Sequence, residues 1–141
     1  MKAIGLDYGE RRIGVAAGDP LGLTAQPLVV IERTSVAADT ARIADIVRRR
    51  GADTIVVGLP LQMDGSMGSQ ARRVRRFALR LGREIGLPVV LWDERLSTAE
   101  AERSLLAAGE RRSDRRAVRD SVAAAVVLQS YLEAQRRQES P

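Results

Sequence analysis

Three acidic residues, Asp7, Glu94 and Asp120, each stand beside an apolar run of the sequence. The neighbouring runs are residues 3–6, 89–92 and 122–126. Burying a charged carboxylate is costly unless a cation or good hydrogen-bond donors compensate it. Three such acids on three separate elements therefore predict a site for divalent metal ions, and with it chemistry on phosphates.

The residue types that are absent narrow this chemistry further. The chain contains no histidine and no cysteine. This excludes serine–histidine triads, imidazole bases, cysteine nucleophiles, disulfides and thiolate zinc sites. Hydrolysis would have to use carboxylates, metal-bound water, a hydroxyl group or Lys2. Oxygen-only coordination favours Mg²⁺ or Mn²⁺ over zinc or copper.

The charge of the chain is carried almost entirely by arginine. The formal net charge is +5, and Lys2 is the only lysine among 23 basic residues. Arginine binds phosphate oxygens through a planar, bidentate fork, although a GC-rich genome would also encode arginine wherever a solvated cation suffices. Aromatic residues make up only 3% of the chain, so backbone charge and shape should matter more than base stacking if nucleic acid binds.

The length and patterning predict one domain, residues 1–141, with a single core. No segment resembles a signal peptide, and no apolar run approaches the length that spans a membrane. We therefore expect a cytoplasmic protein with no membrane partner.

The N-terminal part of the chain has strand signals followed by a helix. A hairpin is predicted over residues 2–8 and 11–18, and a third strand over 22–32. Pro27 interrupts that third strand, which favours an edge position or a bulge. The first helix should begin near Ser35 and end at Gly51, where three arginines face the negative end of the helix dipole.

Helices and short apolar strands alternate in the rest of the chain. Strands are predicted at 54–58 and 88–92, and a helix with its apolar face at 71–85 lies between them. Ser97 and Glu100 form a capping box for a third helix that ends near Gly109. The charged stretch 110–116 then leads into a final helix that ends at about Gln135.

This order of elements predicts an α/β fold. A three-stranded antiparallel meander, followed by two parallel strands, gives a mixed sheet with helices on both faces. Ligands gather at the carboxyl ends of such strands, where Asp7, Glu94 and the loop 61–68 should lie. Asp120 shares a helix face with small residues, which would let that helix lie close to the sheet.

Each candidate acid also has an ordinary structural interpretation. Asp7 could cap a hairpin turn. Glu94 could pair with Arg95, and Asp93 competes with it as the metal ligand. Asp120 could be a first-turn acid that favours the positive end of a helix.

Several arginines are candidates for contacts to substrate phosphate. Arg12 and Arg95 could bind phosphate, brace the carboxylates or form surface salt bridges. The basic pairs before the third acid are better candidates for phosphate contacts: Arg111, Arg112, Arg115 and Arg116. The arginines between residues 72 and 83 are expected to form a solvated helix face.

Four motifs, taken together, resemble a known family. They are GLDYG at 5–9 with RIGVA at 12–16, VGLPL at 57–61 with MDG at 63–65, WDERLST at 92–98, and DSVAA at 120–124. Their order and spacing resemble the YqgF/RuvX-type family of Holliday-junction-resolvase-like and pre-16S rRNA nucleases. That family has a ribonuclease-H-like fold, and the resemblance runs from residue 3 to about residue 132.

The resemblance implies an endonuclease that uses two Mg²⁺ or Mn²⁺ ions held by Asp7, Glu94 and Asp120. One ion would acidify the attacking water, while both, about 3.5–4 Å apart, would stabilise the oxygens around the scissile phosphorus. The substrate would be a four-way DNA junction or pre-16S rRNA. Symmetric cutting of a junction needs a homodimer, whereas processing of an RNA end needs only a monomer.

Two other functions are compatible with the sequence. One is a non-catalytic binding module for branched DNA or an rRNA precursor, which would not need the three acids together. The other is an ATP-using fold of the actin and sugar-kinase type, in which a similar hairpin holds nucleotide phosphates. Such folds close two lobes over the nucleotide, and 141 residues are too few for two lobes.

Overall fold

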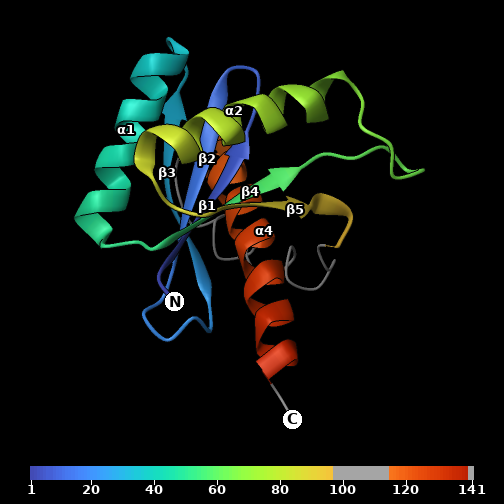
Figure 1. Cartoon of the computed structure of the whole chain (residues 1–141). Coiled ribbons are helices and arrows are strands. Elements are labelled where there is room, and N and C mark those ends of the chain that lie inside the picture. Colours follow the sequence, from blue (N-terminus) through green and yellow to red (C-terminus); the bar gives the residue numbers. More distant parts are fainter. Residues whose placement is uncertain (97–114, 140–141) are drawn as a thin grey trace.

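A computed structural model describes residues 1–96 and 115–139, which form one sheet with helices packed on it (Figure 1). The elements in chain order are β1 (Ala3–Tyr8), β2 (Arg12–Gly18), β3 (Ala25–Glu32), α1 (Val36–Arg50), β4 (Thr54–Leu59), α2 (Ser69–Ile85), β5 (Val89–Asp93), the 3₁₀ turn η1 (Glu94–Leu96) and α4 (Arg115–Glu139). The predicted third helix, with Ser97 and Thr98, lies outside the described residues, as do Arg111 and Arg112.

The five strands lie in the order β3-β2-β1-β4-β5. The pairs β1–β2 and β2–β3 are antiparallel, whereas β1–β4 and β4–β5 are parallel. The predicted mixed sheet, a meander extended by two parallel strands, is therefore confirmed.

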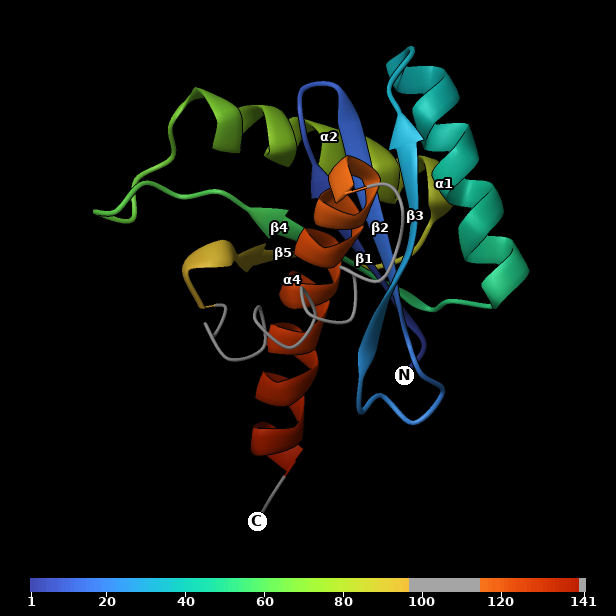
Figure 2. The same cartoon turned by 180° about the vertical axis from the view of Figure 1, so that it is seen from behind.

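The helices cover both faces of the sheet. Helices α1 and α2 pack on one face and α4 crosses the other (Figures 1 and 2). Strand β1 serves both cores because its side chains alternate: Ile4 and Leu6 join the α1/α2 core, whereas Ala3 joins the α4 core with Leu128. Asp7, with the same parity as Ala3, consequently belongs to the α4 face.

Local signals set the helix and strand ends. Ser35 caps α1 by accepting a hydrogen bond from the Ala38 amide at 3.1 Å, and Gly51 closes the helix in the left-handed conformation. Strand β3 is an edge strand, and its register with β2 shifts beside Pro27, as predicted. It begins at Ala25 instead of residue 22, because the Asp19 side chain accepts hydrogen bonds from the two preceding amides and holds them in a turn.

Helix α4 lies unusually close to the sheet because glycine faces it from two strands. A Cβ atom on Gly5 of β1 would lie 2.7 Å from the Leu128 Cβ, and one on Gly14 of β2 would overlap the backbone carbonyl of Asp120. The helix also extends four residues beyond the predicted end, since Arg136 in its last turns donates to the carbonyl of Leu23. None of the helices in the described ranges is both long and apolar enough to cross a membrane.

Candidate active site

The three predicted acids lie around the carboxyl ends of β1 and β5 and the first turns of α4. Asp7 is the penultimate residue of β1 and stands opposite Gly14 of β2. Glu94 directly follows β5, and its Oε1 occupies space beside Gly58 of β4, where a Cβ atom would come within 2.7 Å. Glycine in the two strands that flank β1 therefore makes room both for the start of α4, at Gly14 of β2, and for the Glu94 carboxylate, at Gly58 of β4.

Asp7 and Glu94 form a half-buried carboxyl pair. Burial raises the pKa of Asp7 to about 6, with a further contribution from the negative charge of Asp120. Burial also raises the pKa of Glu94 to about 7, helped by the charges of Asp7 and Asp93. The hydrogen bond between the two side chains lowers the pKa of Asp7 and raises that of Glu94, so the two carboxyl groups titrate as a coupled pair.

Asp120, the third acid, is paired with an arginine. Arg12 Nη1 lies 3.4 Å from Asp120 Oδ2, and Arg12 Nε lies 3.2 Å from Glu32 Oε1. In the part of the chain that the structure describes, no three carboxylates are gathered closely enough to hold one metal ion. Asp7 thus interacts with both other acids: it is hydrogen-bonded to Glu94, and its charge is repelled by that of Asp120.

Asp93, the alternative to Glu94 as a ligand, is engaged by the neighbouring arginine. Arg95 donates to both Asp93 carboxylate oxygens, with its Nη2 at 2.8 Å and its backbone amide at 2.9 Å. Hydrogen bonding from Arg95 lowers the pKa of Asp93. The two adjacent half-buried acids therefore differ in their partners, since Asp93 is paired with Arg95 while Glu94 has no cationic partner among the described residues.

Arg95 also connects the end of β5 to the loop 61–68. Its Nη1 donates to the carbonyl of Met63 at 3.2 Å. The loop has its own bonds as well, because the Ser66 hydroxyl donates to Gln62 Oε1 and to Asp64 Oδ1, and the Gln62 amide donates to the Ser66 carbonyl. Of the other predicted phosphate ligands, Arg115 and Arg116 belong to the first turn of α4.

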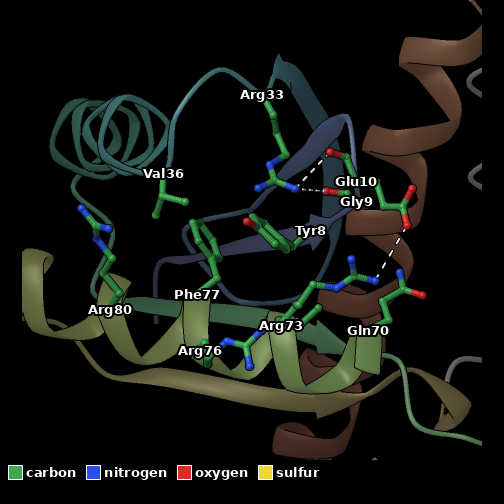
Figure 3. Close-up of a pocket in the computed structure, with 11 residues that line it drawn as sticks. Tyr8, Gly9, Glu10, Arg33, Val36, Gln70, Arg73, Arg76, Phe77 and Arg80 are labelled. Carbon is green, nitrogen blue, oxygen red and sulfur yellow. Dashed lines mark hydrogen bonds and ion pairs between the residues drawn. The ribbon is translucent and has the colours of Figure 1, made fainter. Parts of the chain in front are cut away.

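The sequence did not indicate a second polar cluster, on the opposite side of β1 from Asp7. Arg33 lies over the Tyr8 ring at 4.3 Å, and its Nη1 donates to the carbonyls of Gly9 and Glu10, both at 3.0 Å (Figure 3). Asp39, only 1% exposed, lies 3.8 Å from Arg33 Nε. A first-turn aspartate and an arginine after a strand are ordinary surface patterns, so only the tertiary contacts identify this cluster.

The carboxyl pair makes the stability of the protein depend on pH. Because the folded-state pKa values of Asp7 and Glu94 lie above the unfolded values of 3.8 and 4.5, the folded protein binds more protons between about pH 4 and pH 7. In a chelator, the free energy of unfolding should therefore fall as the pH rises through this window, and level off above it. Urea unfolding from pH 4 to 8 measures this, and a profile that rises towards pH 8 would contradict the buried pair.

The arrangement of strands and helices is that of the ribonuclease-H-like fold. Solved structures share the fold: RuvC of Thermus thermophilus in complex with a Holliday junction substrate superposes with a TM-score of 0.62 at 16% identity, covering 96% of each chain. The yeast mitochondrial Holliday junction resolvase Ydc2 gives a TM-score of 0.58 at 11% identity, covering 97% of this chain and 80% of that one. The predicted ribonuclease-H-like fold is confirmed.

The family can be stated from the sequence relatives. The model of the family described as "RuvX: Holliday junction resolvase" matches residues 1–134, and the chain belongs to this family. A "Putative pre-16S rRNA nuclease" of Moorella thermoacetica is 53% identical, covering 94% of this chain and 95% of its own length. One of the same name in Geobacillus kaustophilus is 51% identical, covering 96% and 100%. The predicted family and the predicted enzyme class, a nuclease, are confirmed.

Proposed function

We propose that the chain is a metal-dependent endonuclease that hydrolyses phosphodiester bonds in structured nucleic acid. The observation that carries this proposal is the half-buried Asp7–Glu94 pair, which has no cationic side chain to compensate it in the described part of the molecule. Such a pair is costly to keep ionised unless a cation joins it. In this proposal residues 1–141 form a single nuclease domain with one active site.

The donor set fits two hard divalent cations. Asp7, Glu94 and Asp120 offer only carboxylate oxygens, the ligands that Mg²⁺ and Mn²⁺ prefer, and Asp7 lies between the other two. When bound, the ions would supply Lewis-acid stabilisation of the phosphate and a more acidic attacking water. Because Asp93 is already paired with Arg95, Glu94 is the better candidate for the metal ligand at the end of β5.

The residues of the chain have separate tasks in this proposal. Asp7, as the shared carboxylate, would bind both ions, while Glu94 would release its proton to solvent when the site fills. Arg12 would hold Asp120 in place through the ion pair that the structure contains, and would become free to contact substrate phosphate if Asp120 turned to the ions. The basic pairs Arg111–Arg112 and Arg115–Arg116 would add phosphate contacts.

The precursor of 16S rRNA is the first substrate to test, because relatives about half identical to this chain carry that name. A four-way DNA junction is the second, because the family description names it. An RNA substrate is compatible with a monomer, whereas symmetric junction cutting would require a homodimer.

A cleavage assay with both labelled substrates tests the proposal. We expect one of them to be cut with Mg²⁺ or Mn²⁺ and left intact in a chelator, because the carboxylates cannot activate water without the ions. Binding is measured alongside on the same substrates. Binding without cleavage under either ion would contradict the proposal and favour a non-catalytic binding module.

A further inference from the structure

A cavity of about 320 Å³ lies on the α1/α2 face of the sheet, beside the β1–β2 turn (Figure 3). Four arginines line it: Arg33 after β3, and Arg73, Arg76 and Arg80 from one side of α2. Among the described residues, Glu10 is the only carboxylate in the lining. This excess of positive charge in a concave site suits an anionic ligand.

The aromatic floor of the cavity is already occupied by protein. Tyr8 stacks on Phe77 with ring centroids 4.1 Å apart, and Arg33 covers the Tyr8 ring from 4.3 Å. Both faces of the tyrosine are therefore covered, and a nucleobase cannot stack on it. Recognition in this cavity must depend on the arginines, and hence on charge.

Two of the four guanidinium groups are available for a ligand. Arg33 is anchored by the carbonyls of Gly9 and Glu10, and Arg80 donates to Glu84 at 2.8 Å. Arg73 forms an exposed ion pair with Glu10 at 3.8 Å, which is too long for a hydrogen bond. Arg76 has no hydrogen-bond or ion-pair partner within the described ranges. Arg73 and Arg76 thus retain their donors, which match phosphate oxygens.

We propose that this cavity binds a backbone phosphate of the nucleic-acid substrate, away from the scissile bond. The proposal rests on the proposed nuclease function and adds a second contact to it. Asp7 and Tyr8 are consecutive in β1, so their side chains point to opposite faces of the sheet. A strand that crosses the β1–β2 turn would therefore meet the carboxylates on one side and the arginine cavity on the other.

The test compares two pairs of arginines on the same helix. Arg73→Gln/Arg76→Gln removes the available donors, whereas the control Arg72→Gln/Arg75→Gln removes the same charge from exposed residues that do not line the cavity. Affinity for the labelled pre-16S rRNA precursor and for the four-way DNA junction is measured in a chelator over a series of salt concentrations. We expect the cavity pair to raise Kd by about tenfold and to reduce the salt slope by about 1. The control should change Kd by no more than about twofold, because Arg72 and Arg75, which are exposed like Arg73 and Arg76, do not line the cavity.

Glu10→Gln gives a change of opposite sign. It removes the carboxylate that competes with phosphate for Arg73, so we expect tighter binding of the substrate. Inorganic phosphate and a mononucleotide are titrated in parallel to separate a backbone phosphate from a small phosphorylated ligand.

Several results would overturn the inference. One is an equal loss of affinity in the two double variants, and another is no loss in Arg73→Gln/Arg76→Gln. The third is micromolar binding of the mononucleotide that requires Arg73 and Arg76 while binding of the polynucleotide does not. Cleavage by the native chain is scored separately. Cleavage with equal losses in both pairs defeats only this inference, whereas cavity-dependent binding without cleavage defeats the proposed nuclease function instead.

Discussion

Asp7→Asn is expected to reduce the cleavage rate by roughly a thousandfold or more, because asparagine could not bind the two cations that the proposed function assigns to the Asp7 carboxylate. The fold should survive. In a chelator at pH 8 the free energy of unfolding should rise by about 1 to 3 kcal/mol, since the substitution removes a buried charge whose folded pKa is raised. Single-turnover cleavage and urea unfolding measure the two effects.

The two acids at the end of β5 provide the matched control. Glu94→Gln should lose activity to a similar degree as Asp7→Asn, whereas Asp93→Asn should cost much less, because Asp93 is bound to Arg95. Retained cleavage in Asp7→Asn would refute the metal role of the pair. A larger loss in Asp93→Asn than in Glu94→Gln would instead identify Asp93 as the ligand.

The predictions from sequence succeeded where the signal was local. Ser35 caps the N-terminus of α1 and Gly51 caps its C-terminus, as predicted. Pro27 marks the irregularity in an edge strand. The start of β3 was predicted three residues early, because the turn before it is held by the Asp19 side chain, whose bonds to the following amides are not visible in a strand pattern.

The candidate site shows the same division. Apolar neighbours in the sequence pointed to Asp7 and Glu94, and partial burial raises the pKa values of both. From sequence, Arg12 could bind phosphate, brace a carboxylate or form a surface salt bridge. Its ion pair with Asp120 could not be predicted, since the two residues are 108 positions apart. The arginine cavity was missed for the same reason: α2 was expected to carry a solvated arginine face, and only the packing of the β1–β2 turn against it creates a concave site.

The second large effect is expected from a glycine. Gly14→Ala should destabilise the protein by about 3 kcal/mol and abolish cleavage, because the new Cβ would overlap the backbone carbonyl of Asp120. The obstacle is backbone in the first turns of α4, so no side-chain rotation can relieve it. The helix must move away from β2, and Asp120 moves with it. Urea unfolding and the cleavage assay report the two losses.

Gly18→Ala separates this packing effect from the general cost of replacing a glycine. Gly18 lies in the same strand, neither glycine has a positive φ, and a Cβ atom on Gly18 would meet its nearest neighbours at an ordinary 3.6 Å. We expect its stability to stay within about 1 kcal/mol of the native chain, with cleavage retained. Similar losses in the two variants would show that the close approach of α4 at Gly14 does not position Asp120. A loss confined to Gly14→Ala would mean that the absence of a side chain on β2 holds the third acid within reach of Asp7.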